Sequence, residues 1–314
     1  MLFLKKLTFA MVLITIALSL GMSVFSSPLL ANTDNTSTNR LESRDKYLNI
    51  MTVNKPQYDM VKIITKDNHN VQYMFTEEND IYNFKYNNEV LSNVSNMDLF
   101  IYSGTSFEPW TNTFINELKK GNLGIINLAR GIRLLNYDQD GVSKENPYYF
   151  IGAEEYKIAL YNVKAAIQDR DPQNRDYYEK NYNNAIKEFD KKLDNYNKKL
   201  KQLNDFTFIT LSNDFDYLLK GIGLNTLKLD NHELSDFIKI NNLDVNKLVI
   251  VEDGENLSGL DLSPYYSVKL WRYYGNMSFD ELIEYNLGEL SKFAKDNSIE
   301  ENDNTVAEES IEEA

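Results

Sequence analysis

Residues 171–203, DPQNRDYYEKNYNNAIKEFDKKLDNYNKKLKQL, decide the fold. After Pro172, a residue favoured in the first turn of a helix, the segment contains neither glycine nor proline. Apolar side chains recur along one face, which predicts a single helix of about 45 Å. This length exceeds one small domain, so we expect a rod that joins two lobes, with a coiled-coil partner as the alternative. The apolar face consists of Tyr178, Tyr182, Ala185, Phe189, Leu193, Tyr196 and Leu200.

The same alternation of strands and helices flanks this segment on both sides. Apolar and β-branched runs predict four strands before it and four after it, with helices in the intervals. Strands separated by helices form parallel sheets with right-handed crossovers. The sequence therefore predicts an α/β protein of two lobes, each with a small parallel four-stranded sheet, joined by one long linking helix. Strands are expected at 48–53, 70–75, 98–102, 123–128, 206–211, 226–229, 247–251 and 267–271, and helices at 54–66, 89–97, 107–120, 153–169, 214–220, 233–240 and 279–295.

Loops at one edge of each sheet are the expected ligand-binding region. In parallel sheets ligands lie beyond the carboxyl ends of the strands, so the two lobes are expected to face each other across a cleft. The loops that would line this cleft follow Phe75, Tyr102, Leu128, Leu211, Val251 and Trp271.

The ends of the chain differ from its body. Residues 1–31 combine a basic start, an apolar run over 7–25 and a small-residue exit, which predicts a secretory signal peptide or, if uncleaved, a membrane anchor. Residues 32–46 are expected to be a spacer, and 296–314, with eight acidic and no basic residues, a disordered tail. Between them we expect a first lobe (47–170), the linking helix (171–204) and a second lobe (205–295), all outside the cytoplasmic membrane.

Composition excludes several functions. The net charge of −14 argues against binding to nucleic acid, which needs a basic surface. The absence of cysteine excludes disulfides, thiolate metal sites and cysteine lipidation. With only two histidines, His69 and His232, and no phosphate loop or nucleophile elbow, we expect no enzyme. Both histidines are interpreted as surface residues.

Several segments resemble the zinc/manganese solute-binding proteins of bacterial ABC transporters, the ZnuA/TroA-like family. The resemblance extends from Leu48 to Phe293 and is most specific at residues 98–110, DLFIYSGTSFEPW. It implies the two-lobed fold with one long linking helix, capture of a small solute or metal ion (zinc or manganese), delivery to an ABC-transporter permease in the membrane, and a monomeric protein. The other matching segments are 146–150 (NPYYF), 171–178 (DPQNRDYY), 213–217 (NDFDY) and 279–290.

The positions that carry metal ligands in this family are altered here. The resemblance places Tyr82, Tyr148 and Ser212 where the family has histidines, and puts the last acidic ligand near Trp271 and Arg272. None of these side chains is a good zinc donor at neutral pH, because a phenol must first be ionised. The sequence therefore predicts the scaffold with a degenerate or altered ligand site.

Three interpretations of the tyrosines remain open. They are ordinary surface or packing residues, or Tyr82, Tyr148, Trp271 and Arg272 line a cleft for an organic ligand, or the two phenolates bind ferric iron. A second class of function is a surface interaction or adhesion protein that keeps the scaffold without metal transport. Separately, Asn136, Asp138 and Asp140 match the opening of a calcium-binding loop, although Pro147 stands where the bidentate glutamate belongs.

Overall fold

The computed structural model describes residues 47–119, 121–139, 141–229, 232–254 and 262–312, with 298–312 described by their backbone. These residues belong to one unit, which extends from Asp45 to Ala314. The expected signal peptide or anchor and the spacer after it lie outside the described residues. Over the described ranges, we find no helix that combines the length and the apolar character needed to cross a membrane.

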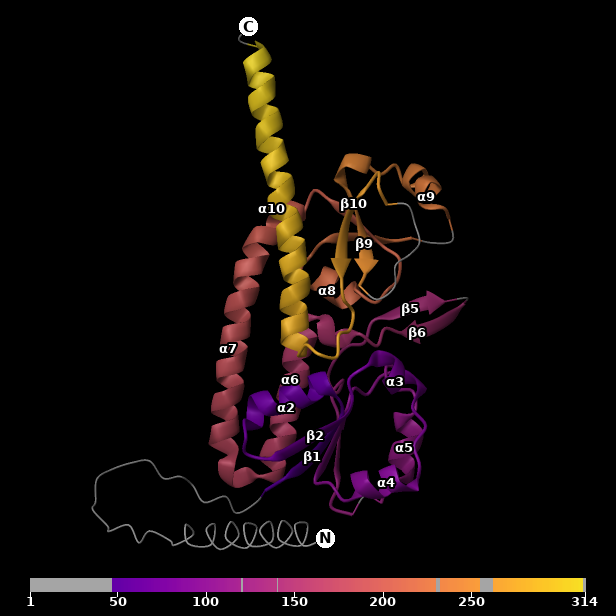
Figure 1. The fold of residues 1–314 in the computed structure, drawn as a ribbon, viewed down its shortest axis with the longest axis vertical. Coiled ribbons are helices and arrows are strands. Elements are labelled where there is room, and N and C mark those ends of the chain that lie inside the picture. Colours follow the sequence, from indigo (N-terminus) through magenta and orange to yellow (C-terminus); the bar gives the residue numbers. More distant parts are fainter. Residues whose placement is uncertain (1–46, 120, 140, 230–231, 255–261, 313–314) are drawn as a thin grey trace, which may run out of the picture. The chain divides into compact units, whose positions relative to one another are not determined.

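Two parallel four-stranded sheets form the framework, as the sequence predicts (Figure 1). The first sheet has the order β2-β1-β3-β4 and the second the order β10-β9-β7-β8. We call the first lobe the first sheet with α2–α5, and the second lobe the second sheet with α8 and α9. The strands are β1 (Asn49–Asn54), β2 (Asn70–Phe75), β3 (Leu99–Tyr102), β4 (Gly124–Asn127), β7 (Thr207–Thr210), β8 (Asn225–Lys228), β9 (Leu248–Asp253) and β10 (Tyr266–Leu270).

The central strands are short, continuous apolar runs that are buried on both faces. Leu99, Phe100 and Ile101 of β3 are buried, as are Val249 and Ile250 of β9, which is the pattern of parallel strands covered by helices. The helices are α2 (Lys55–Thr65), α3 (Glu78–Asn83), α4 (Asn88–Ser95), α5 (Thr111–Glu117), α6 (Ala153–Arg170), α7 (Arg175–Leu200), α8 (Asp216–Gly221), α9 (Leu234–Ile240) and α10 (Phe279–Glu312), with one-turn 3-10 helices at Tyr149–Ile151, Pro172–Asn174, Lys201–Leu203 and Val245–Lys247.

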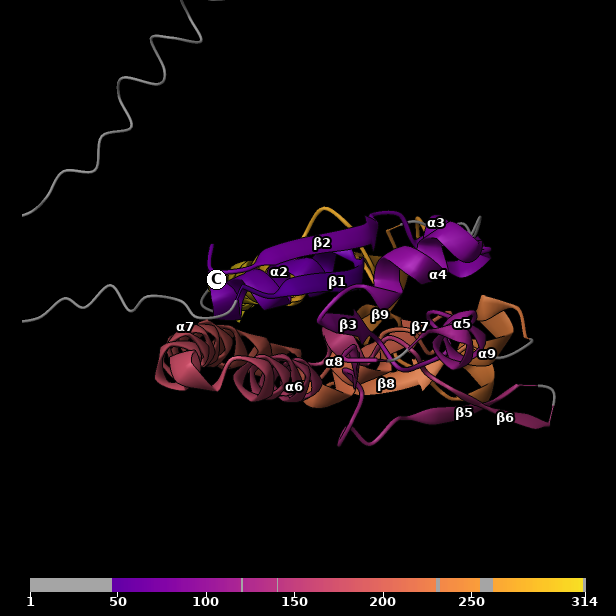
Figure 2. The ribbon, with the colours of Figure 1, turned by 90° about the horizontal axis from the view of Figure 1, so that it is seen from below.

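The long helix predicted from residues 171–203 is α7 with a 3-10 turn at each end. It packs against α2, α6 and α10, and α6 lies beside it in Figures 1 and 2. The Asn181 amide donates to the Ile64 carbonyl of α2 at 2.8 Å, and Lys192 pairs with Glu284 of α10 at 2.6 Å. Since α10 in turn packs on β10, α7 connects elements that adjoin both sheets.

The final helix is longer than the sequence predicts. α10 begins at Phe279 as expected but continues to Glu312, beyond the expected end at Lys295 and through the acidic segment. Beyond Gly288 the segment contains no glycine or proline that would end a helix, and glutamate is a good helix former. The expectation of a disordered tail from 296 onward therefore does not match the backbone over 296–312.

A hairpin forms where the sequence suggests a calcium-binding loop. β5 (Asn136–Gln139) pairs antiparallel with β6 (Val142–Glu145), so Asn136 and Asp138 lie on a strand. Asp138 accepts the Gly141 N–H at 2.9 Å and thereby stabilises the turn, while Asp140 lies outside the described residues. The hairpin extends beside the second lobe (Figure 2), and the Lys228 ammonium lies 5.4 Å from the centre of the Tyr137 ring.

The interpretation of His69 as a surface residue is wrong. Only 3% of it is exposed, and its Nε2 lies 2.7 Å from the Tyr178 hydroxyl of α7. The polar residues around it, Asp67, Asn68 and Asn70, make the segment look like an exposed turn. His232, in contrast, is exposed as expected.

α5 is shorter than the helix predicted over 107–120. It begins only at Thr111 because Glu108 turns back to bind the backbone N–H of Ser103 at 2.7 Å. This contact holds the residues before Thr111 in turns, so the apolar periodicity that starts at Phe107 does not produce helix there.

Candidate functional site

A single arginine connects the two lobes at the predicted ligand-binding region. The Arg272 Nε lies 3.3 Å from Glu78 Oε2, and its Nη1 lies 3.1 Å from Asp214 Oδ2 and 2.9 Å from Asp253 Oδ2. Tyr148 completes the group, because its hydroxyl donates to Glu78 Oε1 at 2.6 Å and its ring centre lies 5.4 Å from the guanidinium carbon. We call these five residues the Arg272 cluster.

The strand order explains why these residues meet. Glu78 begins α3 just after β2, Asp214 follows β7, Asp253 ends β9 and Arg272 follows β10. All four thus stand at the carboxyl ends of parallel strands, where loops of both sheets converge. Glu78 belongs to the first lobe, whereas the two aspartates and Arg272 come from the second.

Burial strengthens the electrostatic interactions within the cluster. The side chains of Arg272, Glu78, Asp214 and Asp253 are between 12% and 19% exposed. Burial opposes the charge on the guanidinium, but Tyr148 and the three carboxylates outweigh it and raise the pKa of Arg272 above its ordinary value. Arginine is therefore a permanent cation at this position.

Tyr148 acts as a hydrogen-bond donor in the cluster. Burial and then the negative charge of Glu78 raise the pKa of Tyr148 well above its ordinary value of 10.0. The phenol consequently keeps its proton at neutral pH and donates a hydrogen bond to the Glu78 carboxylate, which is a different role from iron ligation by a phenolate. Whether the cleft takes an organic ligand stays a prediction.

The structure brings together only part of the predicted site. Tyr148 and Arg272 are in contact, and Ser212 accepts the Asp214 N–H at 3.3 Å, which orients that aspartate. The Trp271 backbone is held by the buried Asn286 amide, through its N–H at 2.9 Å and its carbonyl at 2.8 Å. Tyr82 on α3 is 63% exposed and takes no part in the contacts of the cluster.

Sequence reasoning missed the three carboxylates. The resemblance does not identify Glu78, Asp214 and Asp253, because they do not stand at the family's ligand positions. The available signal was topological: each follows or ends a predicted strand, in loops after Phe75, Leu211 and Val251 that were expected to face the cleft.

Close contacts beside the cluster hold the same two lobes together. The buried Tyr273 donates its hydroxyl to the Thr76 carbonyl at 2.9 Å, and a side chain at Gly275 would lie 1.8 Å from that carbonyl oxygen. Outside the two lobes, Phe150 of the Tyr149–Ile151 turn lies beside Tyr273 and stacks on Phe279 of α10, with the ring centres of Phe150 and Phe279 4.4 Å apart. The Arg272 cluster therefore lies at the edge of a packed contact.

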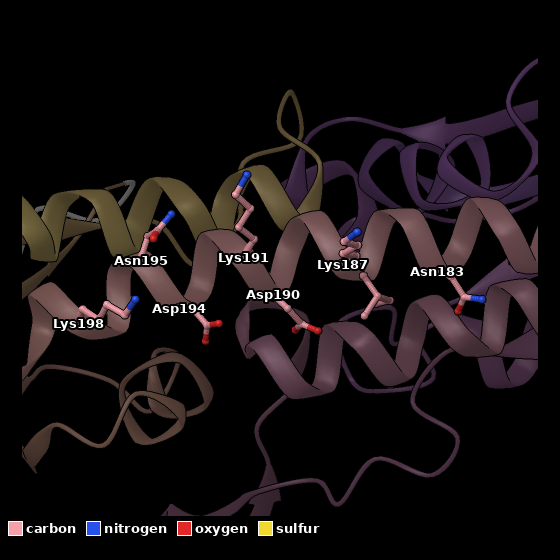
Figure 3. A pocket seen from close by; sticks show the side chains of 8 residues that line it. Asn183, Lys187, Asp190, Lys191, Asp194, Asn195 and Lys198 are labelled. Atoms are coloured by element: carbon pink, nitrogen blue, oxygen red, sulfur yellow. The ribbon is translucent and has the colours of Figure 1, made fainter.

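A separate groove follows the surface of α7 and shares no residue with the cluster (Figure 3). Its side chains come from one helix and are spread along it, so they do not converge on a common point. Lysines alternate with aspartates, and Asp190 is already paired with Lys157 at 3.1 Å. The groove is therefore an ordinary charged helix face, formed by Asn183, Ile186, Lys187, Asp190, Lys191, Asp194, Asn195 and Lys198.

The sequence profile of the family described as "Zinc-uptake complex component A periplasmic" (ZnuA) matches residues 50–249. The chain belongs to this family. It is 25% identical over 213 residues to the high-affinity zinc uptake system protein ZnuA of Bacillus subtilis, which covers 64% of this chain and 67% of that protein. It is 26% identical over 208 residues to the manganese ABC transporter substrate-binding lipoprotein PsaA of Streptococcus pneumoniae, covering 62% and 65%. The alignments with these and similar relatives span about half to two thirds of their length.

Solved structures of other proteins share the fold. The metal-dependent lipoprotein YcdH from Bacillus subtilis superposes with a TM-score of 0.65 at 21% identity, over 78% of this chain and 98% of that one. FpvC from Pseudomonas aeruginosa, solved in complex with Mn²⁺, gives 0.64 at 19% identity, over 80% and 100%. The family and the α/β fold with two parallel four-stranded sheets and a long helix are thus as the sequence predicts.

The Arg272 cluster does not offer the nitrogen-rich donor set that zinc prefers. Imidazole is absent from the Arg272 cluster, and each of its carboxylates already binds Arg272. Within the described ranges, no group of three or more histidine, aspartate or glutamate side chains is placed to hold a metal ion. A guanidinium stands among the carboxylates that a cation would need.

Proposed function

We propose that this protein is the extracytoplasmic solute-binding component of an ABC transporter and that its cleft has lost the imidazole-type metal site. Membership of the zinc-uptake family supports the first part. The Arg272 cluster supports the second and is the observation that carries the proposal: it lies where the carboxyl ends of strands from both sheets meet, yet a guanidinium is bound there.

The proposed partner is a membrane permease with its ATPase. Export would be directed by residues 1–31, and the body of the chain would dock on the outer face of the permease. The extensive packing of α7 against α2 and α10 limits opening to small movements between the lobes.

The test of the transport role begins with the genes beside this one, which we expect to encode a permease and an ATPase, and reconstitutes that pair in proteoliposomes. Adding the protein is expected to increase ATP hydrolysis several-fold, because docking of the binding component activates such transporters. An exposed surface lysine variant, Lys198→Ala, serves as the control. No stimulation at any protein concentration would contradict the transport role and leave the surface-interaction alternative.

Metal titration provides a second prediction. On protein stripped with a chelator, zinc and manganese are expected to bind weakly or not at all, because Arg272 repels a divalent ion and neutral oxygen donors do not replace imidazoles. Isothermal calorimetry measures this, together with a variant that ends at Asn297 and lacks the acidic segment. Tight one-to-one binding that survives this truncation but is lost in Tyr148→Ala would contradict the altered site.

A further inference from the structure

We propose that Arg272 is a tethered internal cation that occupies the place of a captured ion and keeps the cleft closed without one. The inference concerns what joins the two lobes, and it holds whether or not a permease is the partner. Its basis is the arrangement of charges around one guanidinium.

The guanidinium makes the contacts that a bound ion would make. Its Nε binds Glu78 from the first lobe, while Nη1 binds Asp214 and Asp253 from the second. One cationic group thus joins acidic side chains from opposite walls. Without it, three carboxylates would be left together in a poorly exposed place, where mutual repulsion favours opening of the lobes or uptake of another cation.

Arg272 is fixed in this position from its own side of the cleft. The neighbouring Trp271 backbone is bonded at both its N–H and its carbonyl to Asn286, which is fully buried. The Trp271 ring covers Gly254, where a β-carbon would lie 2.2 Å from the ring. The tyrosine ring of Tyr148 lies against the guanidinium at a distance suited to a cation–π contact. The side chain is therefore preorganised.

The charge balance indicates what the cluster would accept in its absence. Three carboxylates and one guanidinium have a formal charge of −2, and removal of the guanidinium leaves −3. Hard divalent cations prefer such oxygen donors, and a free guanidinium ion matches the shape that was removed.

The experiment compares Arg272→Ala with Arg130→Ala, which removes an exposed arginine from the first half of the chain. Melting temperatures are measured in chelator, in Mn²⁺ and in millimolar guanidinium chloride. We expect Arg272→Ala to melt several degrees below the wild type and to regain most of the loss with either cation. The wild type and Arg130→Ala are expected to respond to neither. The double variant Arg272→Ala/Glu78→Gln should bind Mn²⁺ with an affinity at least tenfold lower than that of Arg272→Ala.

Two further measurements keep the proposal testable if Arg272→Ala does not fold. Arg272→Lys retains the charge but not the planar fork, so it should melt below the wild type and Arg130→Ala, whether or not Arg272→Ala folds. In the variant Trp110→Phe, Trp271 is the single tryptophan. Because this variant keeps Arg272, its tryptophan fluorescence emission should be unchanged by chelator or Mn²⁺. Equal melting temperatures for Arg272→Ala and Arg130→Ala would overturn the proposal. One-to-one binding of Mn²⁺ by the wild type would also overturn it. Loss of permease stimulation alone would bear on the transport role and not on this one.

Discussion

Asp171→Ala is expected to lower the free energy of unfolding by about 3–4 kcal/mol, because it removes the carboxylate that accepts the hydroxyl of the buried Tyr178 and lies beside the buried His69. Asp171 accepts the Tyr178 hydroxyl and lies 3.7 Å from His69 Nε2, and all three side chains are at most 3% exposed. Left without this carboxylate, the buried Tyr178 hydroxyl would lose the acceptor to which it donates.

The hydrogen-bond directions in this network follow from one backbone donor. The Leu48 N–H points to His69 Nδ1 at 3.3 Å, so this nitrogen accepts and the neutral ring carries its proton on Nε2. Nε2–H then donates to the Tyr178 oxygen, and the hydroxyl donates to Asp171. The chain of bonds joins the start of the first sheet to the junction between α6 and α7.

Matched variants separate this network from general effects of mutation. Asp169→Ala and Tyr177→Phe remove the same groups at exposed neighbouring positions and should cost less than about 0.5 kcal/mol. Chemical denaturation at pH 7 provides the free energies, and a thermal scan should show Asp171→Ala melting about 5–10 °C lower. A double-mutant cycle with Tyr178→Phe should give a coupling of at least about 1 kcal/mol. Additive effects of the two substitutions would show that the residues do not act together.

The sheets and the long helix are predictable because their signals are local. Buried parallel strands are short apolar runs such as residues 248–251 of β9, and a glycine-free stretch with a regular apolar face has few alternatives to a helix. The start of α2 is equally local. The Asn54 side chain accepts the Gln57 N–H, and the Gln57 side chain accepts the Asn54 N–H. Between them, Pro56 lies in the first turn of the helix.

The network and the cluster could not be predicted in the same way. His69 and Tyr178 are 109 positions apart, and Arg272 and Glu78 are 194 apart, so their contacts depend on how the helices pack. Locally, His69 lies in a polar turn and Glu78 in an acidic one. The hairpin from Asn136 to Glu145 was missed for a different reason: its strands are polar and lack the alternation that marks a half-buried strand.

Glu108 is the second buried acid with a large expected effect, and its effect depends on pH. Its carboxylate receives the Ser103 N–H at 2.7 Å, the Ser103 hydroxyl at 2.8 Å and the Gln57 amide at 2.9 Å. Burial nevertheless outweighs these bonds and raises the pKa of Glu108 from 4.5 to about 7. The folded protein therefore holds this proton over a pH range in which the unfolded chain has released it.

The sign of the effect follows from proton binding. Between pH 4.5 and about 7 the folded state binds more protons at Glu108 than the unfolded state, so the stability due to this group falls as the pH rises. At about 1.36 kcal/mol per pH unit, the interval corresponds to a loss on the order of 3 kcal/mol. The contribution is complete below pH 4.5 and is gone above about pH 8.

Glu108→Gln isolates this contribution, because a glutamine does not titrate. Its amide must place an NH₂ against either the Ser103 N–H or the Gln57 NH₂, so the variant is also less stable at pH 5. The difference in unfolding free energy between wild type and variant is expected to shrink by about 2–3 kcal/mol from pH 5 to pH 8, measured by urea denaturation in steps of half a pH unit. Glu89→Gln, at an exposed position of α4, should give a constant difference over the same range. If the wild-type and Glu108→Gln curves run parallel, the carboxyl is already ionised at pH 5, and the hydrogen bonds from Ser103 and Gln57 have prevailed over burial.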